Sequence, residues 1–128
     1  MAEAKLTPRQ QAQLDVLGTL PPRFEQIHRM VEELASLRAD EALARRLCRL
    51  LDESKAATAT MGLPALADTF GMMSMLARRT SGLQMKIRGL REGLASLKIN
   101  FEGAWRSAST PEDPSASAPP DDRSGDRK

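Results

Sequence analysis

The most constraining feature of this chain is an unbroken heptad pattern in its C-terminal half. Its large apolar residues recur at alternating spacings of four and three, at Leu83, Ile87, Leu90, Leu94, Leu97 and Phe101. This spacing places all of them on one side of an α-helix, and another helix must cover that side. An isolated coiled coil would satisfy the pattern. Because the preceding segments are joined by short connections, we predict an antiparallel helix bundle instead.

Two helices are expected near the N-terminus. Thr7 is a candidate N-cap and Pro8 suits the first helical position, so the first helix should run from there to Gly18. A break is expected over residues 19–22. A second helix then begins at about Pro22, with apolar residues at helical spacing at Phe24, Ile27, Val31 and Leu34.

Two further helices are expected before the heptad segment. Asp40 is the predicted cap of the third, Gly62 ends it, Pro64 opens the fourth, and a break at residues 81–82 follows. The inward face of the third helix is predicted to carry Leu43, Leu47, Leu50, Ser54, Thr58 and Met61. The fourth is predicted to bury Leu63, Leu66, Ala67, Phe70, Met73 and Ala77. Three glycines of the last helix allow close approach of a neighbour, namely Gly89, Gly93 and Gly103.

The predicted fold class is therefore all-α, an antiparallel four-helix bundle with a short extra N-terminal helix. This helical body is assigned to residues 1–106. Residues 107–128 are rich in Pro, Ser and Asp and contain no large apolar residue, so we predict a disordered C-terminal tail. The tail has a net charge of −2 and the body one of +4, within a total of +2.

Composition excludes several kinds of chemistry. His28 and Cys48 are the only histidine and the only cysteine among 128 residues. They exclude an internal disulfide framework and a structural zinc site of four Cys and His ligands, and no other cofactor is indicated. A histidine-based catalytic triad would rest on His28 alone. No apolar run reaches the roughly 20 residues that cross a bilayer, and the N-terminus lacks an apolar signal core. We expect a soluble cytoplasmic protein that is not an enzyme and binds no membrane.

Two surfaces stand out as candidate contact sites. The outward face of the third helix combines charged and very small side chains, at Arg45, Arg49, Asp52, Lys55, Ala56 and Ala59. A solvated face with an Asp52–Lys55 pair would explain it, and so would a docking surface. Apolar residues also fall outside the predicted core, at Met72, Met75, Met85 and Ile99. They are either covered by other helices or exposed for a partner.

The segment DESKAATATMG, residues 52–62, resembles the signature of histidine phosphotransfer (HPt) domains. That signature runs His-x-Leu-Lys-Gly-x-Ala, with a later glycine. Lys55 matches its lysine, Ala56 the small neighbour, and Gly62 the helix-ending glycine. The following LPALADTFGMMSMLA resembles the next helix of the family. The resemblance covers about residues 20–106 and implies a helical bundle preceded by a short helix.

The chain departs from this signature at its reactive position. Asp52 stands where the family has the phosphorylated histidine, and Ser54 replaces the leucine. The transfer needs an imidazole nitrogen that attacks an aspartyl phosphate, and a carboxylate does not supply that nucleophile. Asp52 would instead present a fixed negative charge. The resemblance thus implies a non-catalytic relative that docks on a response-regulator receiver domain or a histidine kinase. Its contact face would include Arg45, Arg49, Asp52, Lys55, Ala56, Ala59, Met72 and Met75.

Three alternatives remain open at this point. The heptad helix with Met85 and Ile99 would suit a generic homodimer or assembly adaptor. Active phosphotransfer would have to use His28, which lies outside the signature. Nucleic-acid binding is not expected and is kept only as a minor alternative, because the basic residues of the last helix are spread around it rather than aligned.

Overall fold

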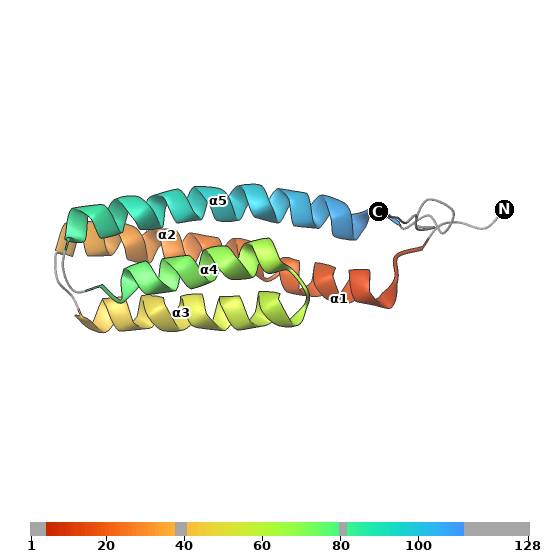
Figure 1. Ribbon diagram of the computed structural model, residues 1–128, viewed down its shortest axis with the longest axis horizontal. Helices are drawn as coiled ribbons and strands as arrows, with labels where there is room; N and C mark the ends of the chain where they lie inside the picture. Colours follow the sequence, from red (N-terminus) through yellow and green to blue (C-terminus); the bar gives the residue numbers. More distant parts are fainter. Residues whose placement is uncertain (1–4, 38–40, 80–81, 112–128) are drawn as a thin grey trace, which may run out of the picture.

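The computed structural model describes residues 5–37, 41–79 and 82–111. Every regular element in these ranges is a helix. They are α1 (Pro8–Leu17), α2 (Leu20–Leu37), α3 (Glu41–Thr60), α4 (Pro64–Ala77) and α5 (Leu83–Ser109). The last four run antiparallel to one another in chain order, and α1 lies at the end of the bundle where α5 ends (Figure 1). The predicted all-α helical bundle is confirmed.

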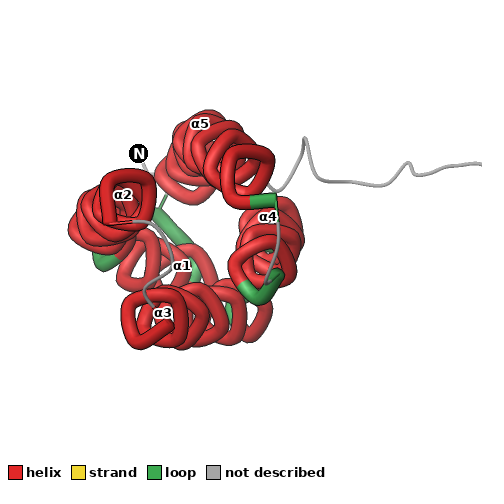
Figure 2. Tube along the Cα trace, turned by 90° about the vertical axis from the view of Figure 1, so that its left-hand side faces the viewer, coloured by secondary structure: helices red, strands yellow, loops and turns green. Residues whose placement is uncertain are grey.

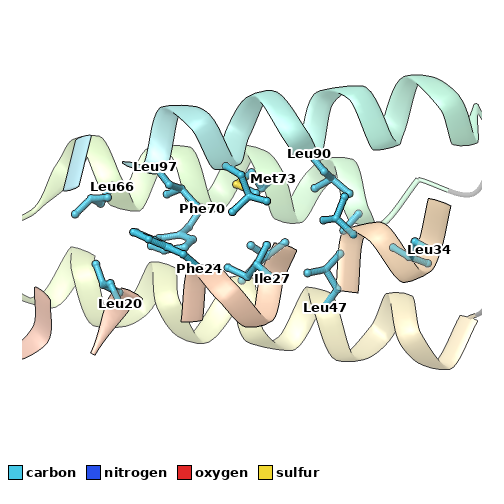
Figure 3. Close-up of a cluster of buried hydrophobic side chains, with 14 of the residues drawn as sticks. Leu20, Phe24, Ile27, Leu34, Leu47, Leu66, Phe70, Met73, Leu90 and Leu97 are labelled. Carbon is cyan, nitrogen blue, oxygen red and sulfur yellow. The ribbon is translucent and has the colours of Figure 1, made fainter. Parts of the chain in front are cut away.

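Seen along its length, the bundle has a helix at each corner (Figure 2). Helix α5 packs against α2 and α4, and α3 packs against the same two, so α2 lies diagonally across from α4. The apolar faces meet in the centre, where Phe24, Phe70 and Met73 lie beside leucines from the other helices (Figure 3). Phe24 meets Phe101 edge to face, with ring centroids 5.7 Å apart. This core fixes how α3 and α4 lie against each other.

The start of α1 follows the predicted pattern. Thr7 is the N-cap, Pro8 occupies the first turn, and Gln10 completes a reciprocal capping box with Thr7. The connection to α2 is shorter than predicted, since α2 already begins at Leu20. The predicted break over residues 19–22 is therefore wrong at its C-terminal end. Pro21 and Pro22 fit in the first turn of α2, where a backbone N–H has no helical partner to lose.

The turn between α3 and α4 forms as expected, with Gly62 at a φ of 71° and Pro64 at the first position of α4. All six residues that were predicted to be buried by α4 are buried. On the predicted inward face of α3, Leu43, Leu47, Ser54 and Thr58 are buried as expected. Leu51 is buried in place of Leu50, which is only partly buried, as is Met61, so this detail of the predicted face is wrong. The predicted cap Asp40 and Ser81 of the second break lie outside the described residues.

Helix α5 continues to Ser109, beyond residue 106, where the helical body was predicted to end. Ala108 is buried there, and the Gln10 side-chain amide donates to the Thr110 carbonyl oxygen at 2.7 Å. The contact of α1 with this segment therefore holds the last turn of α5 against the bundle, and the helix ends at Thr110, which is extended and precedes Pro111. Residues 112–128 of the predicted tail lie outside the described residues.

Two of the three glycines in α5 are places of close helix approach. A methyl group added at Gly93 would lie 2.5 Å from Met73 Cγ, and one at Gly89 would lie 2.7 Å from Leu76 Cδ1. Gly103 has no such neighbour within 4 Å. The predicted close approach is thus confirmed at Gly89 and Gly93, where α4 contacts α5.

Candidate functional site

A shallow open groove of about 540 Å³ runs between α3 and α4. It is lined by Asp52, Lys55, Asp68, Gly71, Met72, Ser74, Met75 and Arg78. The antiparallel packing of the two helices sets the order of these residues along the groove. Asp52 faces Ser74 and Arg78, and Lys55, about one turn further along α3, faces Gly71. Four residues of the predicted contact face are thereby brought together, namely Asp52, Lys55, Met72 and Met75.

The carboxylate of Asp52 is bonded to α4 through both oxygens. Ser74 Oγ donates to Oδ1 at 2.6 Å, and Arg78 Nη2 forms an ion pair with Oδ2. The Arg78 Nε also donates to Ser74 Oγ, at 3.3 Å. The side chains of Arg78 and Asp52 keep 59% and 45% of their exposure, so water reaches the pair. The carboxylate of Asp52 is therefore held in place, as expected, and its negative charge is balanced by the adjacent guanidinium of Arg78.

Lys55 does not form the ion pair with Asp52 that a solvated face would have suggested. No acidic oxygen of the described residues lies within 4.0 Å of its amine. Its aliphatic stem instead lies across α4, where a methyl group at Gly71 would come 3.3 Å from both Cε and Nζ. Because position 71 is a glycine, the Lys55 side chain can lie close to the backbone of α4, and Lys55 nevertheless stays exposed to solvent.

The rim of the groove is apolar and exposed. Met72 and Met75 retain 62% and 71% of their accessible surface, so no other helix of the described chain covers them. Unbranched methionine adapts to irregular partner surfaces, which suits a contact site. The other four predicted residues are exposed on α3 but do not line the groove, namely Arg45, Arg49, Ala56 and Ala59. Arg45 lies 3.7 Å from Glu41 of its own helix.

Sequence reasoning missed half of the groove. Asp68, Gly71, Ser74 and Arg78 were not predicted as site residues. Gly71, Ser74 and Arg78 follow one another at spacings of three and four, which places them on one stripe of α4. That stripe was the available signal, and it required knowing that α3 packs beside it.

The single histidine and the single cysteine of the chain do not line this groove. His28 is exposed on α2, across the bundle from α4. Cys48 lies one turn before Asp52, and burial, opposed by the Arg78 charge, raises the pKa of its thiol. The described ranges contain no group of three His, Cys, Asp or Glu side chains that could hold a metal ion. None of the described helices is both long and apolar enough to cross a membrane.

A second hollow, of about 490 Å³, lies between α2 and α5 and is lined partly by Leu83, Ile87 and Arg91. Beside it Arg91 binds Glu32 through both oxygens, at 2.9 and 2.8 Å. The hydrogen bond from Arg91 lowers the pKa of Glu32. This exposed carboxylate–guanidinium pair on another face provides a natural comparison for Asp52 and Arg78.

No family model, curated protein or solved structure matches the chain. The resemblance to HPt domains therefore stays a prediction from the signature-like segment. The functional argument depends on that segment and on the geometry of the α3–α4 groove.

Proposed function

We propose that the protein is a non-catalytic, HPt-like signalling protein. It docks on a receiver domain or a histidine kinase and modulates two-component signalling by protein–protein interaction. The observation that carries this proposal is the shared groove. Asp52 and Lys55, two of the three charged residues of the signature-like segment, open into one groove with the exposed Met72 and Met75.

The character of this surface supports docking. Its rim is apolar and its interior is charged, a mixture typical of modest, reversible protein interfaces. The small exposed residues Ala56 and Ala59 on the adjacent face of α3 leave space for a partner to approach the backbone. A partner that covers the groove would bury Met72 and Met75, and this apolar burial would contribute favourably to the free energy of binding.

The lack of a nucleophile at position 52 supports a non-catalytic role. A carboxylate already bound by Ser74 and Arg78 offers no imidazole nitrogen for phosphoryl transfer. His28 is on a different helix and has neither Lys nor Gly at the signature spacing. We therefore expect no stable phosphorylation of the chain when it is incubated with a phosphorylated receiver.

Binding measurements on purified proteins test the proposal. The full chain is titrated by calorimetry against receiver domains and kinase dimerisation domains from the same genome. Ala56→Trp should weaken the specific complex about tenfold or more by blocking the surface. Ala35→Trp places the same bulk on exposed α2 and should leave the affinity unchanged. Absence of binding to every domain, or equal affinity of both variants, would contradict the proposal.

A generic homodimer or assembly adaptor is the second candidate. The observation in its favour is the exposure of Met85 and Ile99 on α5, at 70% and 69%. Light scattering over a concentration series should then show a dimer that Ile99→Lys dissociates. A chain that stays monomeric at all concentrations would remove this candidate.

A further inference from the structure

We propose that Arg78 is an anion latch, which Asp52 occupies in the free protein and a phosphoryl group of the partner occupies in the complex. The groove would then bind a phosphorylated receiver in preference to the unphosphorylated one. This inference rests on the proposed docking function and adds the state of the partner that is recognised. No covalent bond forms or breaks, because Arg78 only exchanges one anion for another.

The groove contains two cations that flank one anion. Arg78 reaches Asp52 from α4, and Lys55 lies one turn beyond Asp52 over Gly71. Both cations are exposed, and Lys55 has no acidic partner among the described side chains. An anion that enters beside Asp52 therefore meets Lys55 directly and can meet Arg78 if Asp52 releases it.

The competition for Arg78 favours a phosphoryl group over a carboxylate. Asp52 belongs to the same chain, so its bond to Arg78 carries no cost of association. A partner carboxylate, with the same charge, gains little by replacing it. A phosphoryl group carries a charge of about −1.5 to −2 and three acceptor oxygens, so it can bind Arg78 and Lys55 together.

Breaking the Asp52–Arg78 ion pair costs the folded protein little free energy. Ion pairs as exposed as this one contribute little to stability, because water solvates both partners once they separate. Asp52 would still accept the Ser74 hydroxyl, at 2.6 Å, and its half-exposed carboxylate would be hydrated. The exchange leaves no charge buried without a partner.

The exposed rim indicates that this phosphoryl group is carried by a protein. Met72 and Met75 gain contact only when an apolar surface covers them, and inorganic phosphate offers none. We therefore assign the groove to the phosphorylated face of a receiver domain. Free phosphate serves as a comparison in the test.

The test compares matched variants of the full chain. Asp52→Asn keeps an oxygen for Ser74 but removes the competing charge, and Arg78→Gln removes the latch. Glu32→Gln removes the same kind of charge from the Glu32–Arg91 pair on another face. Each is titrated against each receiver domain, unphosphorylated and as its beryllofluoride adduct, and against inorganic phosphate. Circular dichroism confirms that each variant is folded.

We expect the wild type to prefer the beryllofluoride adduct and to bind inorganic phosphate at least tenfold more weakly than that adduct. Asp52→Asn should strengthen binding of the adduct about two- to fivefold. Arg78→Gln should abolish the preference for the adduct over the unphosphorylated receiver. Glu32→Gln should leave the affinity for both receiver states unchanged. Equal wild-type affinity for both receiver states, or weaker adduct binding by Asp52→Asn, would overturn the latch but leave docking intact. Failure of every receiver to bind in either state would also overturn the latch, and failure of the kinase dimerisation domains as well would overturn the proposed function.

Discussion

The side chain of Lys55 on α3 lies across Gly71 on α4, so that a methyl group at position 71 would come 3.3 Å from the lysine amine nitrogen. Glycine inside a helix normally lowers stability by about 1 kcal/mol relative to alanine. Because Gly71 has no side chain, the side chain of Lys55 can lie close against the backbone of α4. The shape of the groove therefore depends on a residue that helix propensity disfavours.

Gly71→Ala should stabilise the fold by about 0.5–1 kcal/mol, because alanine favours the helix and the flexible end of Lys55 can move aside. Urea unfolding monitored by circular dichroism measures the change. The gain should be somewhat larger in a Lys55→Ala background, where no side chain has to move. A loss of stability in both backgrounds would contradict this account of the contact.

Gly93→Ala should have the opposite effect. The added methyl group would lie 2.5 Å from Met73 Cγ, and Met73 is almost completely buried, so the core must shift. Overpacking of this kind outweighs the helix propensity gained and should destabilise the fold by about 1–2 kcal/mol. Gly103→Ala is the matched control, because nothing lies within 4 Å of its added methyl group. That variant should be more stable than the wild type, and equal effects at the two sites would refute the packing argument.

Gln10→Ala should loosen the end of α5. The Gln10 amide bonds the carbonyl oxygens of Ser107 and Thr110, and its side-chain oxygen accepts from Thr7 N. Loss of these bonds from a buried side chain should lower the free energy of unfolding by about 1–2 kcal/mol. Hydrogen exchange should become faster at the last turn of α5. Gln11→Ala, on the exposed side of α1, should leave both measurements unchanged.

The Glu32–Arg91 pair should make stability depend on acidity. The pKa of Glu32 is lowered from 4.5 in the folded chain, chiefly by the hydrogen bond from Arg91. The carboxylate therefore adds stability that is present above the unfolded pKa and lost as the pH falls through the folded pKa. Glu32→Gln should be less stable than the wild type at pH 7, and the difference should vanish in acid. Urea unfolding at a series of pH values measures it, and a difference independent of pH would exclude this role.

Much of the fold could be predicted from local signals. Thr7, Pro8, Gly62 and Pro64 mark helix ends through their own backbone chemistry, which needs no knowledge of distant residues. The heptad spacing in α5 likewise identified its buried side. The first turn of α2 was missed because proline is a reliable helix breaker only beyond that turn.

The remaining features depend on contacts between distant parts of the chain. The last turn of α5 is bonded to Gln10, which lies 100 positions before Thr110 in the sequence. Leu51 rather than Leu50 is buried because the rotation of α3 follows its packing against α2 and α4. The pairing of Asp52 with Arg78 spans 26 positions and joins two helices. Periodicity placed Asp52 on the right face but could not show what lies opposite.

The bonds of Gln10 also bring the two ends of the folded bundle together. Thr7 and Thr110 are both held by this one side chain, so a short linker could join residue 111 to residue 5 without crossing the bundle. New ends could then be opened in the connection between α4 and α5. Such a circular permutant should keep helices α1 to α5 and the groove, and should unfold cooperatively in urea. The order of the helices along the chain would thus be separable from the surface that they build.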